Sequence, residues 1–209
     1  MAEANPNSRL EAFCDGVFAI AITLLVIDIK IPEMSKVNTS ADLWRALRSI
    51  APSISAFLLS FGVVLITWVN HHNHLRLINK SCGSFLYANG FLLLTVVFIP
   101  FPTSLLGQYL LTNAAAPPVI LYDSVLVLQS IGWVLIATTA LNNHLGKSEE
   151  ANREIRKNGK FGYFALTLYS LCAMLAIWFP LAVASFTTLT WIFWLLFGIN
   201  IKNEKGVGS

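Results

Sequence analysis

Six apolar stretches separated by polar segments constrain this chain more than any other feature. They cover residues 12–29, 50–69, 85–106, 118–141, 161–179 and 181–201. A helix needs about 20 apolar residues to cross the hydrocarbon core of a bilayer. Lipid offers no partners to exposed backbone groups, so a spanning segment must satisfy its own hydrogen bonds. The sequence therefore predicts an all-α membrane protein with six transmembrane helices, in one domain over residues 1–209.

The composition supports a surface that faces lipid. Hydrophobic residues make up 56% of the chain and charged residues only 12%, whereas a soluble domain has roughly a quarter of its residues charged. The basic residues lie in the connecting segments rather than on a face with interleaved aromatics, which excludes a nucleic-acid partner. Three widely spaced cysteines, Cys14, Cys82 and Cys172, predict neither a disulfide framework nor a zinc site. The charged segment 142–160 is expected to be a loop with at most a turn of surface helix.

The distribution of Lys and Arg predicts the orientation in the membrane, because cytoplasmic segments carry an excess of positive charge. One side would hold ten such residues: Arg9, Arg76, Lys80, Lys147, Arg153, Arg156, Lys157, Lys160, Lys202 and Lys205. The other side would hold four: Lys30, Lys36, Arg45 and Arg48. We therefore expect a plasma-membrane protein with both termini in the cytoplasm. A short helix within 38–49, capped by Ser40, is expected near the outer surface.

The first apolar stretch is unusual because ionisable residues lie close to it. Its uninterrupted run, 16–27, is short, and a segment containing Arg9 and Asp15 extends it at the inner end. Such groups are costly near hydrocarbon and mark functional sites. On a helical wheel, three large aliphatic residues fall within about 60° of one another, with a threonine at their edge: Ile20, Leu24, Ile27 and Thr23. An opposite stripe contains Asp15, Phe18, Ile22, Leu25 and Ile29.

The same residues carry a family resemblance. Arg9, three residues, and then Phe13-Cys14-Asp15 open a helix that continues Val-Phe-Ala-Ile-Ala-Ile-Thr-Leu-Leu. This string closely resembles the first helix of prokaryotic relatives of the endolysosomal transmembrane potassium channel family, whose signature ends in Phe-Ser-Asp. The six spans, the polar segment between the fourth and fifth spans, and Trp68-x-x-His71 are compatible with that family. Cys14 replaces the serine, and a thiol is the weaker hydrogen-bond donor.

The resemblance implies a leak-like, potassium-selective channel that is a homotetramer with the first helix lining a central pore. It implies no pore-loop filter, no cofactor and no metal besides permeant K⁺. Ile20 would form the narrowest ring, with Leu24 and Ile27 above it and the Thr23 hydroxyls nearby. A hydrophobic ring forces an ion to shed part of its hydration shell, which costs K⁺ less than Na⁺. From the residues alone, the simpler interpretation is that these aliphatic side chains face lipid or another helix, as most do in a membrane helix.

The remaining motif residues are interpreted as structural. A buried pair of Arg9 and Asp15, with further partners, would fix the first helix against the second, since buried charges persist only when paired. The residues assigned to this group are Arg9, Phe13, Cys14, Asp15, Trp68, Asn70 and His71. Asp28 could concentrate cations at the outer mouth of the pore, or it could be a solvated charge at a helix end.

Two other functions compete with a channel. The run of residues 70–74 contains three of the four histidines and suggests a metal site, but no carboxylate pattern accompanies it. No nucleophile motif, catalytic carboxylate pair or phosphate loop predicts an enzyme. The stronger alternative is a small secondary transporter or exporter, which would need ionisable residues near the bilayer midplane. The second to sixth spans are expected to lack them, which favours a passive pore.

Overall fold

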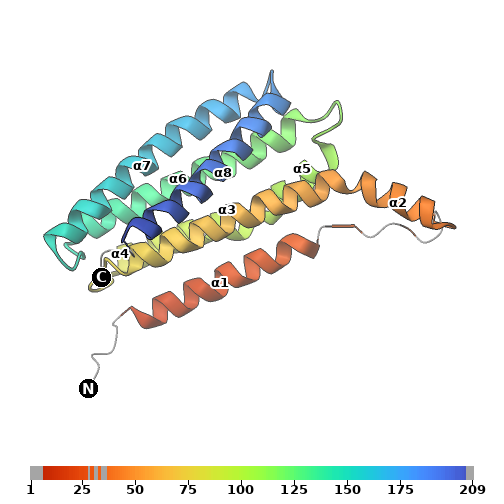
Figure 1. Ribbon diagram of the computed structural model, residues 1–209. Coiled ribbons are helices and arrows are strands. Elements are labelled where there is room, and N and C mark those ends of the chain that lie inside the picture. The colour runs from red at the N-terminus through yellow and green to blue at the C-terminus, as the bar shows by residue number, and fades with distance from the viewer. Residues whose placement is uncertain (1–6, 28, 31–32, 34–36, 206–209) are drawn as a thin grey trace.

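The protein is an elongated bundle of helices (Figure 1). The computed structural model describes residues 7–27, 29–30, 33 and 37–205, with side chains up to Ile192. Apart from one isolated bridge between Ile78 and Gly146, all regular structure in this part is helical, so the all-α prediction is confirmed. The helices are α1 (Ser8–Ile27), α2 (Ser40–Ser49), α3 (Ala51–Leu75), α4 (Gly83–Phe98), α5 (Pro100–Tyr109), α6 (Ala116–Asn142), α7 (Glu149–Leu175) and α8 (Pro180–Lys205).

Four segments in the described part are long and apolar enough to cross a membrane. They are α1, α3, the stretch Gly83–Tyr109 that joins α4 and α5, and α6. The apolar part of α8 described here, Pro180–Ile192, is shorter, and α7 joins a charged first half to an apolar second half. These four segments of the described part are candidate spans by length and composition, and the fifth and sixth spans stay predictions.

The third predicted span is divided into α4 and α5 at a proline. Pro100 has no N–H, so it cannot continue the backbone ladder of α4. The N–H of Ile99 instead donates to Val96, 3.2 Å away and three residues back, which tightens the last turn of α4. Helix α5 then begins at Pro100, where a missing N–H costs little.

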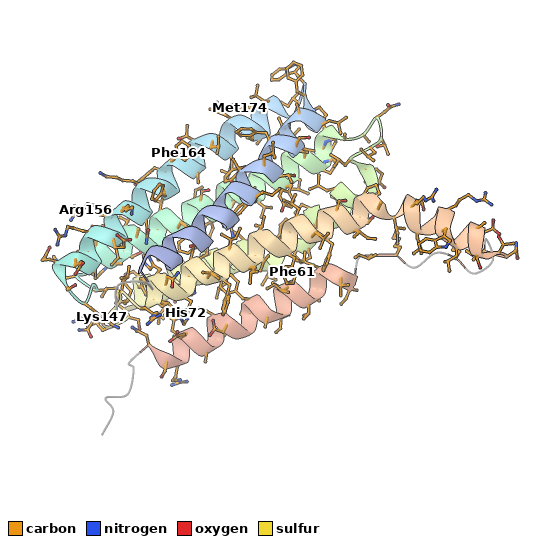
Figure 2. All side chains as sticks on the ribbon, viewed as in Figure 1. Phe61, His72, Lys147, Arg156, Phe164 and Met174 are labelled. Atoms are coloured by element: carbon orange, nitrogen blue, oxygen red, sulfur yellow. The ribbon has the colours of Figure 1, made fainter. Side chains whose placement is uncertain are left out.

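Hydrogen bonds hold several connections together at one end of the bundle. The Asn7 amide donates to the carbonyl of Ile78, 3.1 Å away, in the α3–α4 connection. The N–H of Asn79 donates to Leu145, 2.8 Å away, in the α6–α7 connection. The side chain of Lys147 lies at this end, close to the first turns of α7 (Figure 2). The segments that the charge count assigns to one side of the membrane thus lie together.

Helix α7 corrects the prediction of a loop over 142–160, because the chain is helical from Glu149 onward. The Ser148 hydroxyl accepts a hydrogen bond from the N–H of Ala151, 3.1 Å away, and caps the helix. Acidic residues in the first turn are favourable beside the helix dipole. Between its charged residues, α7 carries a buried stripe of mostly small side chains. They are Ala151, Ile155, Gly159 and Gly162. This stripe packs against α6, with which α7 makes its most extensive contact.

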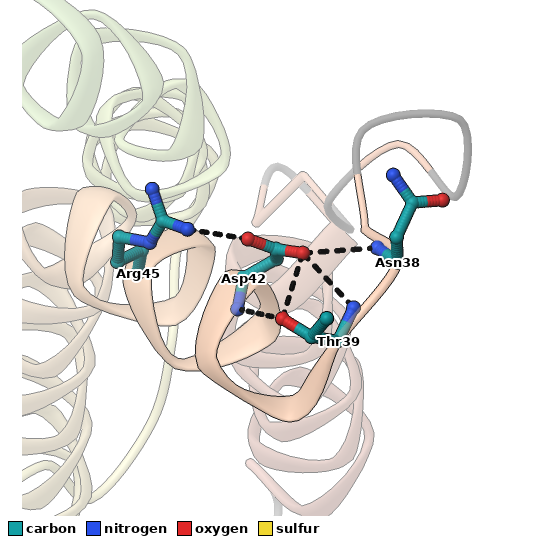
Figure 3. A network of polar contacts seen from close by, with 4 residues as sticks. All are labelled: Asn38, Thr39, Asp42 and Arg45. Carbon is teal, nitrogen blue, oxygen red and sulfur yellow. Dashed lines mark hydrogen bonds and ion pairs between the residues drawn. The ribbon is translucent and has the colours of Figure 1, made fainter.

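Helix α2 projects away from the bundle and has a polar network at its start (Figures 1 and 3). The Thr39 hydroxyl accepts from the N–H of Asp42 at 3.2 Å, and the Asp42 carboxylate accepts from the N–H of Thr39 at 2.9 Å. The cap is therefore Thr39 rather than the expected Ser40, which is the first helical residue. Bonds from the Thr39 side chain and the Asn38 N–H lower the pKa of Asp42, which also pairs with Arg45.

A buried polar layer joins α3 to α5 and α6. Ser60 on α3 has its hydroxyl 2.6 Å from that of Thr103 on α5 and 3.1 Å from the Tyr122 hydroxyl on α6. The Gln129 amide on α6 donates to the Thr67 hydroxyl at 3.0 Å. Buried polar groups require such partners, and their directions fix how the three helices meet. These hydrogen bonds hold α3, against which α1 packs, in a fixed position relative to α5 and α6.

Candidate functional site

Helix α1 lies at one edge of the subunit and has two different faces (Figure 1). On the inner face, Cys14, Phe18, Ala21 and Leu25 are each at most 1% exposed. Their spacing of four, three and four residues is that of a single helical face. They belong to the main hydrophobic core together with residues of α3 and α6. One side of α1 therefore attaches it to the subunit.

The opposite face of α1 carries all four residues predicted to form the constriction. Ile20 is 59% exposed, Leu24 38% and Ile27 72%, and Thr23 is also exposed. The Thr23 hydroxyl donates to the carbonyl of Ile20 at 2.8 Å, which leaves its oxygen lone pairs available on this face. Seven residues of helix separate Ile20 from Ile27, or about 10 Å. Within the described part of the subunit, this face is an uncovered aliphatic strip with one hydroxyl.

Asp15 lies away from that strip and connects α1 to α3. Its Oδ1 accepts a hydrogen bond from the Trp68 indole N–H at 2.8 Å, and a bond to a charged acceptor is stronger than a neutral one. In the described residues Arg9 is exposed and forms no ion pair with Asp15. Six residues along a helix rotate a side chain by about 240°, so the two point in different directions. Among the described residues, the Asp15 carboxylate is hydrogen-bonded to Trp68.

A second polar contact between α1 and α3 lies one helical turn from the contact between Asp15 and Trp68. The Nδ1 of His72 lies 3.0 Å from Oε1 of Glu11, although not in the alignment of a hydrogen bond. Glu11 and Asp15 are four residues apart on α1, and Trp68 and His72 are four apart on α3. Such pairs share one helical face, and the helices run in opposite directions. An axial slip of one turn would break both contacts, so together they fix the register of α1 on α3.

His71 faces the inner side of α1 and has a partner that the sequence did not indicate. Its Nε2 lies 2.8 Å from Oδ1 of Asn89 on α4, and its ring lies 5.5 Å from that of Phe18. The Asn89 amide also donates to Phe85 at 2.7 Å. Asn70, which was expected with His71 beside a buried pair of Arg9 and Asp15, is exposed. Adjacent helical residues differ by about 100° in direction, so Asn70 cannot share the buried position of His71.

The other histidines of the α3 end, His72 and His74, lie in different surroundings. His74 is buried with its ring 6.2 Å from that of Trp133, while His72 faces Glu11. No group of three or more His, Cys, Asp or Glu side chains that could hold a metal ion occurs among the described residues. Asp28, expected near the outer mouth, lies outside the described residues.

A buried carboxylate lies on α6, among the apolar residues of the fourth predicted span. Asp123 is 1% exposed, and its Oδ1 accepts from the hydroxyl of Thr187 on α8 at 3.0 Å. The expectation concerned ionisable residues near the bilayer midplane, and Asp123 is the eighth residue of the 27-residue α6, toward one end of that helix. The signal was available in the sequence, as the one acidic residue in the apolar stretch 118–141. Asp123 does not belong to the α1 face and belongs to a separate part of the bundle.

Comparison with known proteins places this arrangement in a family. Residues 9–100, which contain α1 from its second residue onward and all of α2, α3 and α4, match the model of the family described as the endosomal/lysosomal potassium channel TMEM175. A protein of Chamaesiphon minutus named a potassium channel is 38% identical over 195 residues, covering 86% of this chain and 96% of that protein. The chain belongs to the TMEM175 family. This is a family of ion channels and not of enzymes.

Solved structures of TMEM175 proteins share the fold. The crystal structure of a lysosomal potassium-selective channel TMEM175 homolog from Chamaesiphon minutus superposes with a TM-score of 0.81. It is 34% identical, and the match covers 91% of this chain and 96% of that one. A mouse relative, named an endosomal/lysosomal proton channel, is 29% identical over 87% of this chain, which spans only 38% of that longer protein.

Proposed function

We propose that this TMEM175 protein is the subunit of a potassium channel whose pore is lined by the exposed face of α1. The observation that carries the proposal is the division of α1 into two faces. One face is buried and held by polar contacts, and the other presents Ile20, Thr23, Leu24 and Ile27 uncovered. Bacterial relatives are named potassium channels, which favours a pore over a lipid contact for this face.

A homotetramer around a central axis would bring four copies of α1 together. Closed rotational symmetry is the usual arrangement of identical subunits, and a helix at the edge of the subunit can reach the axis. Rings of Ile20, Leu24 and Ile27 would then follow one another over about 10 Å. An ion passing the Ile20 ring loses part of its hydration shell, which K⁺ does at a lower cost than Na⁺. The Thr23 oxygens would partly replace the lost water.

The polar contacts between α1 and α3 support this assignment in a second way. Asp15 accepts a hydrogen bond from Trp68, and Glu11 lies close to His72. These two contacts define the position of α1 along its own axis and its rotation about that axis relative to α3. A ring of side chains can discriminate ions only when its diameter is reproducible, which requires a helix of fixed orientation. The motif thus acts on the pore indirectly, by orienting the helix that forms it.

The proposed topology has six crossings: α1, α3, α4 with α5, α6, α7 and α8. Helix α7 contains 27 residues, or about 40 Å, whereas the hydrocarbon core is about 30 Å thick. Its charged first half can therefore extend into the cytoplasm while its apolar half crosses. The clustering of the positively charged connections at one end supports a cytoplasmic position for both termini. We place the protein in the plasma membrane.

Ion flux from liposomes tests the proposal. Purified protein is reconstituted with K⁺ inside and Na⁺ outside, and parallel samples carry the reverse gradient or only a proton gradient. The proposal predicts that K⁺ efflux exceeds Na⁺ flux. The K⁺ efflux should not require a second, coupled ion, apart from the ion that an added ionophore carries to balance the charge. Flux that requires a coupled ion would support a transporter instead. Proton flux without K⁺ flux would assign this chain the activity for which the mouse relative is named.

A further inference from the structure

A cavity that is partly open to the surface lies away from the α1 face. It has a volume of about 280 Å³ and is bounded by α3, α5, α6 and α8. Ser53 near the start of α3 donates to Gly107 near the end of α5 at 3.2 Å, which places the cavity at the end opposite Asn7 and Ile78. That end is the outer one in the proposed topology. Most of the lining is aliphatic, including Leu59, Leu106, Leu110, Val119 and Ala184.

Asp123 is one of the residues that line this cavity, and its carboxylate is only half satisfied. Its Oδ1 accepts from Thr187, but Oδ2 is buried and has no hydrogen-bond partner among the described residues. No ion pair joins the carboxylate to a Lys, Arg or His side chain among the described residues. A buried carboxylate without a cation or a full set of donors is strongly unfavourable. The site is therefore complementary to a ligand that brings a positive charge and N–H donors.

We propose that this cavity binds a small organic ammonium, whose charged group donates to the Asp123 carboxylate while its apolar part lies against the leucine side chains. Carboxylate and ammonium neutralise each other in a low-dielectric site, where their attraction is strongest. The aliphatic lining accommodates the hydrocarbon part, as in most small-molecule sites with a few polar groups that fix orientation. The binding is independent of the pore proposed for α1.

The lining favours an organic cation over a metal ion. A hard metal cation needs about six or more oxygen ligands. Besides Asp123, the lining offers the hydroxyls of Ser55, Tyr122, Thr187 and Thr188, and that of Tyr122 already contacts Ser60. The volume also exceeds what one bare ion or water fills, since a water needs about 10–15 Å³ of such space. An ammonium with a compact hydrocarbon group satisfies both the charge and the volume.

Calorimetric titration of the purified full-length protein with cyclohexylammonium tests the proposal, with cyclohexanol as the neutral probe of similar shape. At neutral pH we expect saturable binding of the amine and much weaker binding of the alcohol. Asp123→Asn keeps the shape of the side chain and should weaken amine binding about tenfold or more while leaving the alcohol unchanged. Ala184→Phe should fill the cavity and abolish amine binding with Asp123 intact. Asp42→Asn, on the exposed α2, is the control and should have no effect.

Three results would overturn the assignment. They are equal amine binding by wild type and Asp123→Asn, no binding by wild type, and loss of amine binding when K⁺ replaces Na⁺ at constant ionic strength. The last result would identify a metal-cation site instead. If Asp123→Asn does not fold, Ala184→Phe and the K⁺ competition in wild type still decide the question. Since binding is read by heat, its outcome does not depend on whether the liposome assay detects potassium flux.

Discussion

Replacing Trp68 with phenylalanine should loosen the attachment of α1 without changing the pore face. The substitution removes the indole N–H that donates to Asp15 at 2.8 Å and leaves a half-buried carboxylate without that donor. Hydrogen bonds to charged groups contribute about 1.5–3 kcal/mol, and because Asp15 is only half-buried we expect about 1.5–2 kcal/mol. For a chain of this length that lowers Tm by about 3–8 °C.

The assay heats the purified protein in detergent and follows the loss of its folded peak in size-exclusion chromatography. Trp44→Phe is the matched control, since Trp44 on α2 is 65% exposed and should shift Tm little. Asp15→Asn keeps an acceptor for Trp68 and should cost less than Trp68→Phe. The double variant removes the charge and the donor together, so its loss should be smaller than the sum of the single losses.

Two results would refute this reasoning. If Trp68→Phe melts like Trp44→Phe, the contact between α1 and α3 does not hold the helix in place. If Asp15→Asn leaves Tm unchanged but alters the ratio of K⁺ to Na⁺ flux, Asp15 acts in the pore rather than as an anchor.

Three further predictions concern the rest of the bundle. Thr39→Ala removes the cap of α2 and should cost about 0.5–2 kcal/mol of helix stability, seen as faster amide exchange confined to that helix. Gly107→Ala places a Cβ 2.7 Å from a backbone atom of α3 and should lower stability by about 1–3 kcal/mol in thermal melts, whereas Gly90→Ala meets nothing within 4 Å and should not. Cysteines introduced at 113–116 and 147–160 should react with an impermeant thiol reagent from opposite sides of the membrane, and labelling from one side would contradict six crossings.

The two faces of α1 followed from helical periodicity alone. The wheel grouped Phe18 with Leu25 and set Ile20 apart with Ile27, and the structure buries the first pair and exposes the second. This worked because an unbroken helix fixes direction through a single angle per residue. The wheel does not show what covers the exposed face, so the pore itself stays a proposal.

Sequence reasoning failed where a contact depends on distant segments. The partner of His71 is Asn89 on another helix, and no local pattern in one sequence encodes that pairing. The helical half of segment 142–160 was missed because its packing face is made of small residues, which give a weak hydrophobic signal between charges. Asp123 was overlooked because one polar residue barely changes the mean apolarity of a span, although its burial against Thr187 is specific.

The most direct test of the pore assignment compares two exposed aliphatic positions on opposite sides of the subunit. Ile20 on α1 is 59% exposed and Leu171 on α7 is 50% exposed, and the two helices lie at opposite edges of the bundle (Figure 1). Ratios of K⁺ to Na⁺ flux are measured in liposomes for Ile20→Asn and Leu171→Asn at matched amounts of protein.

If α1 lines the pore, Ile20→Asn hydrates the narrowest ring, increases the total flux and lowers the K⁺ to Na⁺ ratio. Leu171 faces lipid if α1 lines the pore, so Leu171→Asn should leave the ratio of K⁺ to Na⁺ flux unchanged. An unchanged ratio for Ile20→Asn, or an equal change for both variants, would contradict the assignment of the pore to α1.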